Sequence, residues 1–267
     1  MTIDEPSALP LISRGQQRSA RRLLSRRDRD ETGLFLAEGA QAVREALRHP
    51  ELVEALVVDD PETHAELVGM ADPLITWRAH PDDMAQLSDT VTPQGVIAIC
   101  RQKLSHLDEI VKPKLVVVCA QVRDPGNAGT VIRCADAFGA DAVVFTKGSV
   151  EVFNPKTVRA SVGSIFHLPI VVGVEIADAL TWLRGQGMQV FAADGGGAHL
   201  DELGDALTRP TAWIMGNEAW GLPERERSLA DQVVGVPMWG QAESLNLSTA
   251  AAVCLYATAS AQRREQA

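Results

Sequence analysis

Short apolar runs alternate with amphipathic stretches along most of the chain, and this alternation predicts strands separated by helices. The run LVVVCA at 115–120 is continuously apolar, as expected for a strand that is buried on both faces of a parallel sheet. Strands that alternate with helices are typical of such a sheet. Strands are expected at 34–37, 55–58, 74–77, 95–100, 115–120, 142–145, 168–172, 189–193, 211–215 and 232–236.

A polar stretch with proline and lysine at 101–114 interrupts this pattern and predicts a boundary between two α/β domains. The chain is long enough for two domains with buried cores. The predicted parts are a basic arm (1–30), a small domain (31–104), a linker (105–113) and a larger domain (114–267). Helices are expected at 41–48, 61–70, 154–161, 180–185, 247–262 and from Ala128 onward.

Charge is distributed unevenly and changes the interpretation of the N-terminus. The net charge is −10, yet 14–29 holds seven arginines and one acid, a local charge of +6 that leaves −16 on the rest. A basic arm on an acidic body is the pattern expected for docking on a polyanion, and a solvated tail is the alternative. No apolar run approaches the roughly 20 residues that span a bilayer, and no signal segment is evident, so a soluble cytoplasmic protein is expected.

Metal and thiol chemistry have little support in the sequence. The four cysteines are widely spaced, and they are expected to be reduced and mostly buried. The six histidines show no spacing typical of ligands, so no metal site is predicted.

The stretch QVRDPGNAGTVIRCADAFGA at 121–140 predicts a strand end, a tight loop and a helix opening. Asn127 is expected to cap that helix. The apolar stripe of that helix consists of Val131, Ile132, Ala135 and Phe138. Arg133 lies about 170° from the centre of this stripe, so it points away from the packed face. The loop has neither the lysine of a P-loop nor a dinucleotide fingerprint.

Two further loops combine strand ends with polar side chains. In WIMGNEAWGLP at 213–223, Gly216 follows a strand directly and would let a ligand approach the backbone, although an ordinary turn explains it equally well. In VPMWGQAESLNLSTAAAVCLYA at 236–257, Ser244, Asn246 and Ser248 crowd the start of an alanine-rich helix. One of these three is expected to be a helix cap, and three are more than capping requires.

Together, GNAGTVIR, MGNEAWGLP and VPMWGQAESLNLSTAAAV closely resemble the three motifs of the SpoU (TrmH-like) family of RNA ribose 2′-O-methyltransferases, in the SPOUT superfamily. The resemblance covers roughly 114–261 and includes NPKTVRASVGSIFHLPI at 154–170. The N-terminal FLAEGAQAVREAL and GVIAIC are similar, more loosely, to an L30e-like RNA-binding domain. The resemblance implies a knotted (trefoil) parallel-sheet domain, a homodimer formed through the C-terminal domain, and S-adenosylmethionine (SAM) as cofactor.

The resemblance also implies roles for individual residues. Arg133 matches the catalytic arginine, and because arginine stays protonated we expect it to hold a substrate phosphate while phosphate or water takes the proton. Asn127 and Asn246 would hold Arg133 and the loops, Glu218 would orient side chains, and Ser244 would position substrate. The residues expected to contact SAM are Gly216, Val236 and Leu245, and those expected to bind RNA are Arg14, Arg18, Arg21, Arg22, Arg26 and Arg159.

The predicted function is SAM-dependent 2′-O-ribose methylation of structured RNA, with 23S ribosomal RNA favoured. The alternatives are a tRNA 2′-O-methyltransferase and a non-catalytic RNA-binding or ribosome-assembly protein with the same fold. A nucleotide-dependent oxidoreductase or NTPase would need a fingerprint that the chain lacks. The run Gly195–Gly197 does not supply one and is expected to be a loop.

Overall fold

The computed structural model of the protein describes residues 9–265, and within them the chain forms two compact units. The first unit combines the chain up to Lys103 with the segment Phe153–Phe166, and the second combines Leu104–Val152 with the chain from His167 onward. The first eight residues of the predicted arm and the last two of the predicted larger domain lie outside the described residues.

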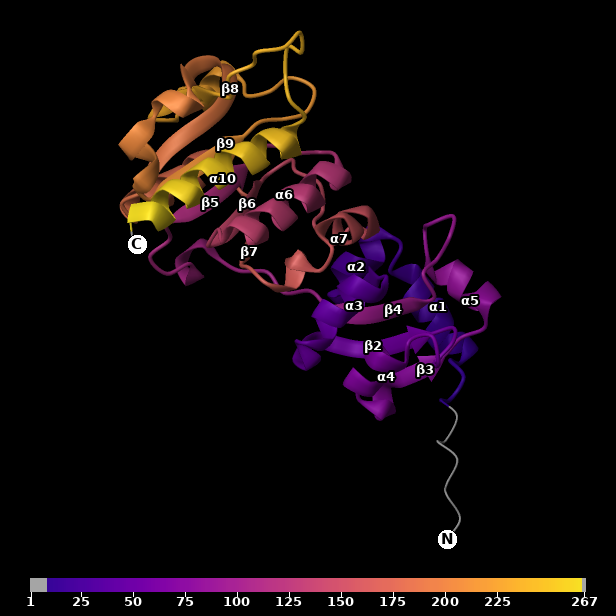
Figure 1. Cartoon of the computed structure of the whole chain (residues 1–267). Coiled ribbons are helices and arrows are strands. Elements are labelled where there is room, and N and C mark those ends of the chain that lie inside the picture. The colour runs from indigo at the N-terminus through magenta and orange to yellow at the C-terminus, as the bar shows by residue number, and fades with distance from the viewer. Residues whose placement is uncertain (1–8, 266–267) are drawn as a thin grey trace. The chain divides into compact units, whose positions relative to one another are not determined.

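The N-terminal unit is built on a mixed sheet of four strands in the order β1-β4-β2-β3 (Figure 1). Strand β4 pairs antiparallel with β1 and β2, and β3 pairs parallel with β2. The strands are β1 (Leu34–Glu38), β2 (Val53–Val58), β3 (Thr76–Arg78) and β4 (Val96–Arg101). The helices are α1 (Arg14–Arg22), α2 (Arg26–Thr32), α3 (Ala40–Leu47), α4 (Ala65–Met70), α5 (Pro81–Leu87) and α7 (Pro155–Ser161).

The basic stretch predicted as an arm folds into helices α1 and α2. A capping box at Ser13 starts α1, and Ala20 and Leu23 are buried in the core of the N-terminal unit. Arg29 is 1% exposed and donates hydrogen bonds to the carbonyls of Leu23 (2.8 Å) and Leu24 (3.0 Å) at the end of α1. Arg29 therefore stabilises this unit. The exposed arginines of the stretch are Arg14, Arg18, Arg21, Arg22, Arg26 and Arg27.

The segment 153–166 packs on the N-terminal unit, although it lies between two strands of the C-terminal sheet in the sequence. The Phe35 ring lies 4.7 Å from that of Phe153 and 5.8 Å from that of Phe166, measured between centroids. Arg159 forms ion pairs with Glu38 (3.3 Å) and Asp89. Sequence patterning predicted helix 154–161 correctly, but only the packing assigns it to this unit.

The C-terminal unit contains a parallel sheet of six strands in the order β10-β8-β9-β5-β6-β7 (Figure 1). The fold class predicted from the sequence is thus confirmed. The strands are β5 (Leu115–Cys119), β6 (Ala142–Thr146), β7 (Ile170–Val174), β8 (Gln189–His199), β9 (Thr211–Met215) and β10 (Gln232–Gly235). The helices are α6 (Pro125–Phe138), α8 (Ile176–Gly185), α9 (Glu224–Arg227) and α10 (Leu247–Glu265).

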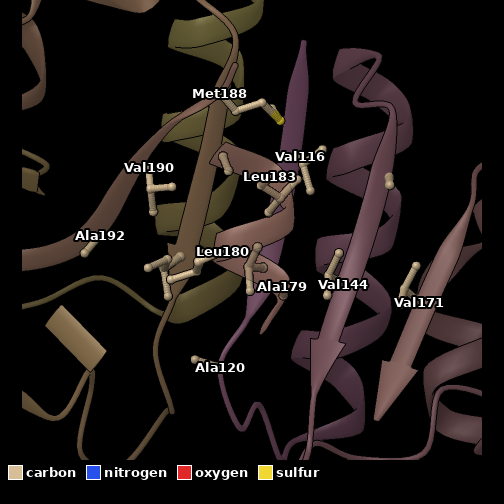
Figure 2. Packing of buried hydrophobic residues seen from close by; sticks show 14 of the residues in the cluster. Val116, Ala120, Val144, Val171, Ala179, Leu180, Leu183, Met188, Val190 and Ala192 are labelled. Carbon is tan, nitrogen blue, oxygen red and sulfur yellow. The ribbon is translucent and has the colours of Figure 1, made fainter. Parts of the chain in front are cut away.

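Helices cover both faces of this sheet, which explains why its strands are apolar without alternation. Val116, Val144 and Val190 pack with Leu180 and Leu183 of α8 on one face (Figure 2). On the other face α6 and α10 pack together, and the Trp213 indole donates a 2.9 Å hydrogen bond to Thr258 of α10. The strand ends are thereby held at one rigid edge.

Several boundaries differ from the sequence-based prediction. Helix α6 begins at Pro125 and its cap is Asp124, whose carboxylate accepts the Asn127 amide at 2.8 Å, so the prediction of Asn127 as the cap was wrong. Gly195–Gly197 lie within β8 and not in a loop. A Cβ on Gly197 would lie 2.0 Å from the Val233 carbonyl, so the glycine allows β8 and β10 to approach closely.

Short regular elements also replace stretches predicted as strand or linker. The predicted strand at 74–77 begins as the short 3₁₀ helix Pro73–Ile75 and continues as β3. The predicted linker contains the 3₁₀ helix Leu107–Glu109, and Ile110 is buried in the core of the C-terminal unit. Among residues 9–265, no helix combines the length and the apolar character needed to cross a bilayer.

Candidate active site

A cavity of about 510 Å³ lies at the carboxyl ends of β9 and β10 and beside the middle of β8, and parallel sheets bind ligands at the carboxyl ends of their strands. All three residues predicted to contact the cofactor line it, and so do Glu218, Ser244 and Asn246. The lining residues are Ala193, Asp194, Gly195, Met215, Gly216, Asn217, Glu218, Ala219, Gly221, Val234, Val236, Met238, Glu243, Ser244, Leu245, Asn246, Leu247 and Ala250.

The loop after β9 is a tight hairpin whose shape depends on Gly216. The backbones of Asn217 and Gly221 exchange hydrogen bonds of 2.8 and 2.9 Å, and the Asn217 side chain donates to the Gln121 carbonyl at 2.7 Å. A Cβ on Gly216 would lie 2.5 Å from the carbonyl carbon of Gly221. Since these neighbours are backbone atoms, no side chain at position 216 fits without moving the hairpin.

Glu218 joins this hairpin to the loop between β5 and α6. One carboxylate oxygen accepts hydrogen bonds from the amide of Asp124 (3.1 Å) and the Asn127 side chain (3.3 Å), and the other accepts the amide of Arg123 (3.2 Å). Charge-assisted bonds to backbone amides are among the stronger hydrogen bonds in proteins. Glu218 therefore holds two of the three motifs together.

Asn246 adds the third motif to the same network. Its side-chain oxygen accepts the Ser248 amide (2.9 Å) and hydroxyl (2.6 Å) at the start of α10, and its side-chain amide donates to Asn127 at 3.0 Å. Of the three polar residues at this helix start, Asn246 acts as the cap. A continuous series of hydrogen bonds thus connects α10, Asn246, Asn127 and Glu218, residues that lie far apart in the sequence.

Arg133 stands apart from this network. Its side chain is exposed, as the helical periodicity predicted, while Val131, Ile132 and Ala135 are buried. Within residues 9–265 it forms no hydrogen bond or ion pair, and neither Arg133 nor Asn127 lines the cavity. Asn127 and Asn246 bind each other and the loops, and neither bonds to Arg133.

The residues that line the cavity fit SAM. Met215, Val234 and Leu245 offer apolar surface for an adenine ring, and the strand ends offer backbone groups for hydrogen bonding. Glu218 and Asp194 bring carboxylates to a site that would receive the positive sulfonium and ammonium groups of SAM. The volume lies within the range typical of small-molecule sites. These residues together could hold the cofactor.

Several residues of the site were not singled out from the sequence. Asp194 extends from β8 into the cavity, and Asn217 and Gln121 bridge the first two loops. Gln121 adopts a left-handed conformation (φ 54°), which is uncommon for a residue with a side chain. The position of Asp194 directly after an apolar run was a signal that could have identified it.

No thiol or metal chemistry is suggested at this site. Burial raises the pKa of Cys119, and the nearby Glu218 carboxylate raises it further, so this thiol stays protonated. Burial also raises the pKa of Cys254, to about 12. All four cysteines are free, and Cys134 alone is only half-buried. The described part of the chain contains no group of three or more side chains suited to a metal ion.

The predicted RNA-binding residues belong to the N-terminal unit and divide into two kinds. The predicted arginines of α1 and α2 (Arg14, Arg18, Arg21, Arg22 and Arg26) are exposed and can reach a polyanion. Arg159 instead is half-buried between the carboxylates of Glu38 and Asp89, while the nearby Ser161 is fully buried and donates to the Val158 carbonyl. These contacts give α7 a structural role in its unit.

Comparison with protein families matches residues 114–256 to the model of the SpoU rRNA Methylase family, which is more than half of the chain. The chain belongs to the SpoU rRNA methylase family. Residues 16–98 match the MRM3-like substrate binding domain. The sequence-based assignment of both parts is therefore confirmed.

Two relatives match most of this chain along most of their own length. The chain is 35% identical over 239 residues to the Bacillus subtilis 23S rRNA (guanosine(2553)-2′-O)-methyltransferase RlmP, covering 88% of this chain and 92% of that protein. It is 32% identical over 250 residues to the 23S rRNA (uridine(2479)-2′-O)-methyltransferase of Streptomyces viridochromogenes, covering 87% and 84%.

Solved structures agree with this assignment. The SpoU methyltransferase AviRb from Streptomyces viridochromogenes, in complex with the cofactor AdoMet, superimposes with a TM-score of 0.82 at 29% identity, covering 96% of this chain and 99% of that chain. The AdoMet-bound rRNA methyltransferase from Sinorhizobium meliloti has a TM-score of 0.81 at 30% identity, covering 97% of each chain. These structures bear out the predicted cofactor.

Proposed function

We propose that this protein transfers a methyl group from SAM to a ribose 2′-oxygen of 23S ribosomal RNA. The observation that carries this function is the cavity at the carboxyl ends of β9 and β10. The three residues predicted to contact the cofactor line it, and the network of Glu218, Asn127 and Asn246 borders it. The chain is an RNA ribose 2′-O-methyltransferase by family and by the names of its relatives.

The side chains perform different parts of this reaction. SAM, when bound, supplies a methyl group on a positively charged sulfur that a nucleophile can attack. Glu218 and Asn246 hold the three loops in one geometry, which the in-line approach of a ribose oxygen requires. The Arg133 side chain is exposed and forms no hydrogen bond or ion pair among residues 9–265, and its guanidinium binds the phosphate beside the target ribose. That phosphate or a water takes the proton as the new C–O bond forms.

Methyl transfer from labelled SAM to 23S rRNA purified from cells without the gene tests this function. Mapping the modified nucleotide in RNA from cells with and without the gene then identifies the target. Purified tRNA should accept little label, because the relatives that match most of the chain are named as 23S rRNA enzymes. Retained RNA binding without methyl incorporation would instead favour a non-catalytic RNA-binding protein.

The arginines of α1 and α2 supply electrostatic binding to the RNA backbone in this proposal. Each arginine that contacts a phosphate steepens the fall of log K with log [salt] by about 0.7 to 0.9. Replacing Arg21, Arg22, Arg26 and Arg27 by glutamine should weaken rRNA binding and lower this slope by about 3 at most. Binding titrations between 50 and 200 mM salt measure it. Arg209→Gln is the control. An unchanged salt dependence of RNA binding in the fourfold variant would show that these arginines do not contact the RNA.

We further propose that the protein acts as a homodimer through α6 and α10. Tyr256 on α10 is 61% exposed and packs edge-on against Phe138 of α6, with ring centroids 5.6 Å apart. Val253 on the same helix is also exposed. A hollow of about 330 Å³ lined by Phe138, Tyr256, Ala259, Ser260, Arg263 and Arg264 adjoins them. A second copy would remove this apolar surface from water.

Tyr256→Asp should convert the dimer to a monomer, because a charge in the centre of the interface would lose its water. Sedimentation equilibrium measures the change, and we expect the dissociation constant to rise by at least about 100-fold. Val111→Asp, at an exposed apolar residue of the predicted linker, is the control and should stay dimeric. Identical sedimentation of the wild type and Tyr256→Asp would place the interface elsewhere.

Two further features follow from the family and are proposed on that basis. The C-terminal chain is proposed to form a trefoil knot, in which the loops around Gly216, Val236 and Leu245 hold the cofactor. The protein is proposed to work in the cytoplasm, where ribosomal RNA is made and assembled in bacteria such as those of its relatives.

A further inference from the structure

Two exposed tryptophans stand on loops that border the cavity, and the reaction as derived above uses neither. Trp220 lies between the cavity-lining residues Ala219 and Gly221, and it is 49% exposed. Trp239 follows the cavity-lining Met238 and is 87% exposed. Large aromatic side chains are usually buried to a large extent, so two exposed ones beside the same site indicate a surface that binds a ligand.

The surroundings of Trp220 keep its ring in a fixed position. The hairpin that carries it is closed by the paired backbones of Asn217 and Gly221. The guanidinium of Arg123 lies 4.9 Å from the centre of the indole ring, a cation–π contact, and the Arg123 amide donates to Glu218. The same network that joins the motifs therefore also presents an aromatic surface with a positive charge stacked on it.

We propose that Trp220, together with Arg123, and Trp239 bind unstacked bases of the RNA at the mouth of the cavity. The inference rests on the proposed function, and it assigns these residues to positioning the substrate. A cavity of about 510 Å³ accommodates a cofactor and one reacting group but not a duplex, so the target ribose enters it from an unpaired or splayed-out stretch of the RNA. Its base and that of its neighbour then lose their stacking partners.

Aromatic side chains and arginine planes are the groups that replace such lost stacking. Proteins that bind single-stranded or splayed-out RNA stack its bases on aromatic rings or guanidinium groups. The positive charge of Arg123 favours an RNA ligand over an uncharged apolar partner. The N-terminal unit has no equivalent surface at Phe35, which is 1% exposed and packed between two other rings.

Steady-state methylation of 23S rRNA by Trp220→Ala and Trp239→Ala tests the proposal. Stacking of one base contributes about 1–3 kcal/mol, so each variant should raise KM for the RNA about 10-fold. Trp220→Phe and Trp239→Phe keep a smaller ring and should raise it only about 3-fold. The dissociation constant for SAM and the salt dependence of RNA binding should stay unchanged in all four. Val111→Ala removes an exposed apolar side chain of the predicted linker and is the control.

The possible outcomes separate this proposal from the function it rests on. A wild-type protein that does not methylate 23S rRNA would overturn the function itself. An active wild type with unchanged KM in both alanine variants would overturn the stacking role alone. Alanine variants that change the sedimentation of the protein but not its KM would show that the tryptophans contact a second copy, and this too would overturn the proposal.

Discussion

Arg133→Ala should lower methyl transfer to rRNA by at least about 100-fold while the affinity for SAM stays within about twofold of wild type. The reason is geometric: the Arg133 side chain does not line the cavity and forms no hydrogen bond within residues 9–265, so its removal disturbs neither the proposed cofactor site nor the loops. What is lost is the guanidinium that we propose binds the substrate phosphate. Single-turnover kinetics with saturating RNA, together with calorimetric titration of SAM, measure the two effects separately.

Two further variants refine this expectation. Arg133→Lys keeps the charge but loses the planar fork that binds a phosphate at two points, so activity should fall between that of wild type and Arg133→Ala. Arg209→Ala removes an exposed arginine at the amino end of β9, the edge of the sheet opposite the cavity, and should leave activity unchanged. Wild-type activity in the Arg133→Ala variant would show that Arg133 has no role in catalysis.

Gly216→Ala should weaken SAM binding by at least about 100-fold, because the hairpin beside the cofactor has no room for a methyl group. The added Cβ would meet three backbone atoms of Gly221 and Leu222 at 2.5 to 2.8 Å, and backbone cannot rotate away as a side chain can. The hairpin must therefore shift, and the Glu218 that it carries shifts with it. Calorimetric titration with SAM measures the loss, and thermal unfolding tests whether the rest of the fold is intact.

Gly240→Ala is a matched control in the loop that contains Met238 and Ser244. A Cβ there would meet nothing within 4 Å, so this variant should bind SAM as the wild type does. Equal SAM affinities in Gly216→Ala and Gly240→Ala would show that the hairpin accommodates the added methyl group without any loss of SAM binding. The close approach at Gly216 would then have no role in shaping the site.

Much of the C-terminal unit could be predicted from local pattern. Runs such as LVVVCA are apolar because helices cover both faces of the sheet, and the strands appear where these runs predicted them. The motif residues Glu218, Ser244 and Asn246 follow strand ends, and parallel strands bring their ends to one edge. Their convergence on one cavity therefore follows from sequence order and sheet geometry.

Other features were not predicted. Asp124 rather than Asn127 caps α6, and Pro125 at the first helical position was a local signal for this cap. Asn127 bonds instead to Glu218 and Asn246, contacts that no local pattern contains. Arg29 looked like one more basic residue of an arm, but the end of α1 offers it two carbonyls and the core covers it. The hydrogen-bond partners of Arg29 and Asn127 were therefore determined by tertiary packing.

The sequence by itself determined the family, the reaction class, the cofactor and six of the residues that line the cavity, because these are encoded in short motifs that follow the strands. Only the tertiary structure decided that 153–166 completes the N-terminal unit, and that Asp194 and two exposed tryptophans border the cofactor cavity. The physical reason is the distance along the chain over which each effect acts. Strand and helix preferences act over a few residues, whereas burial and hydrogen bonding join groups that lie many residues apart.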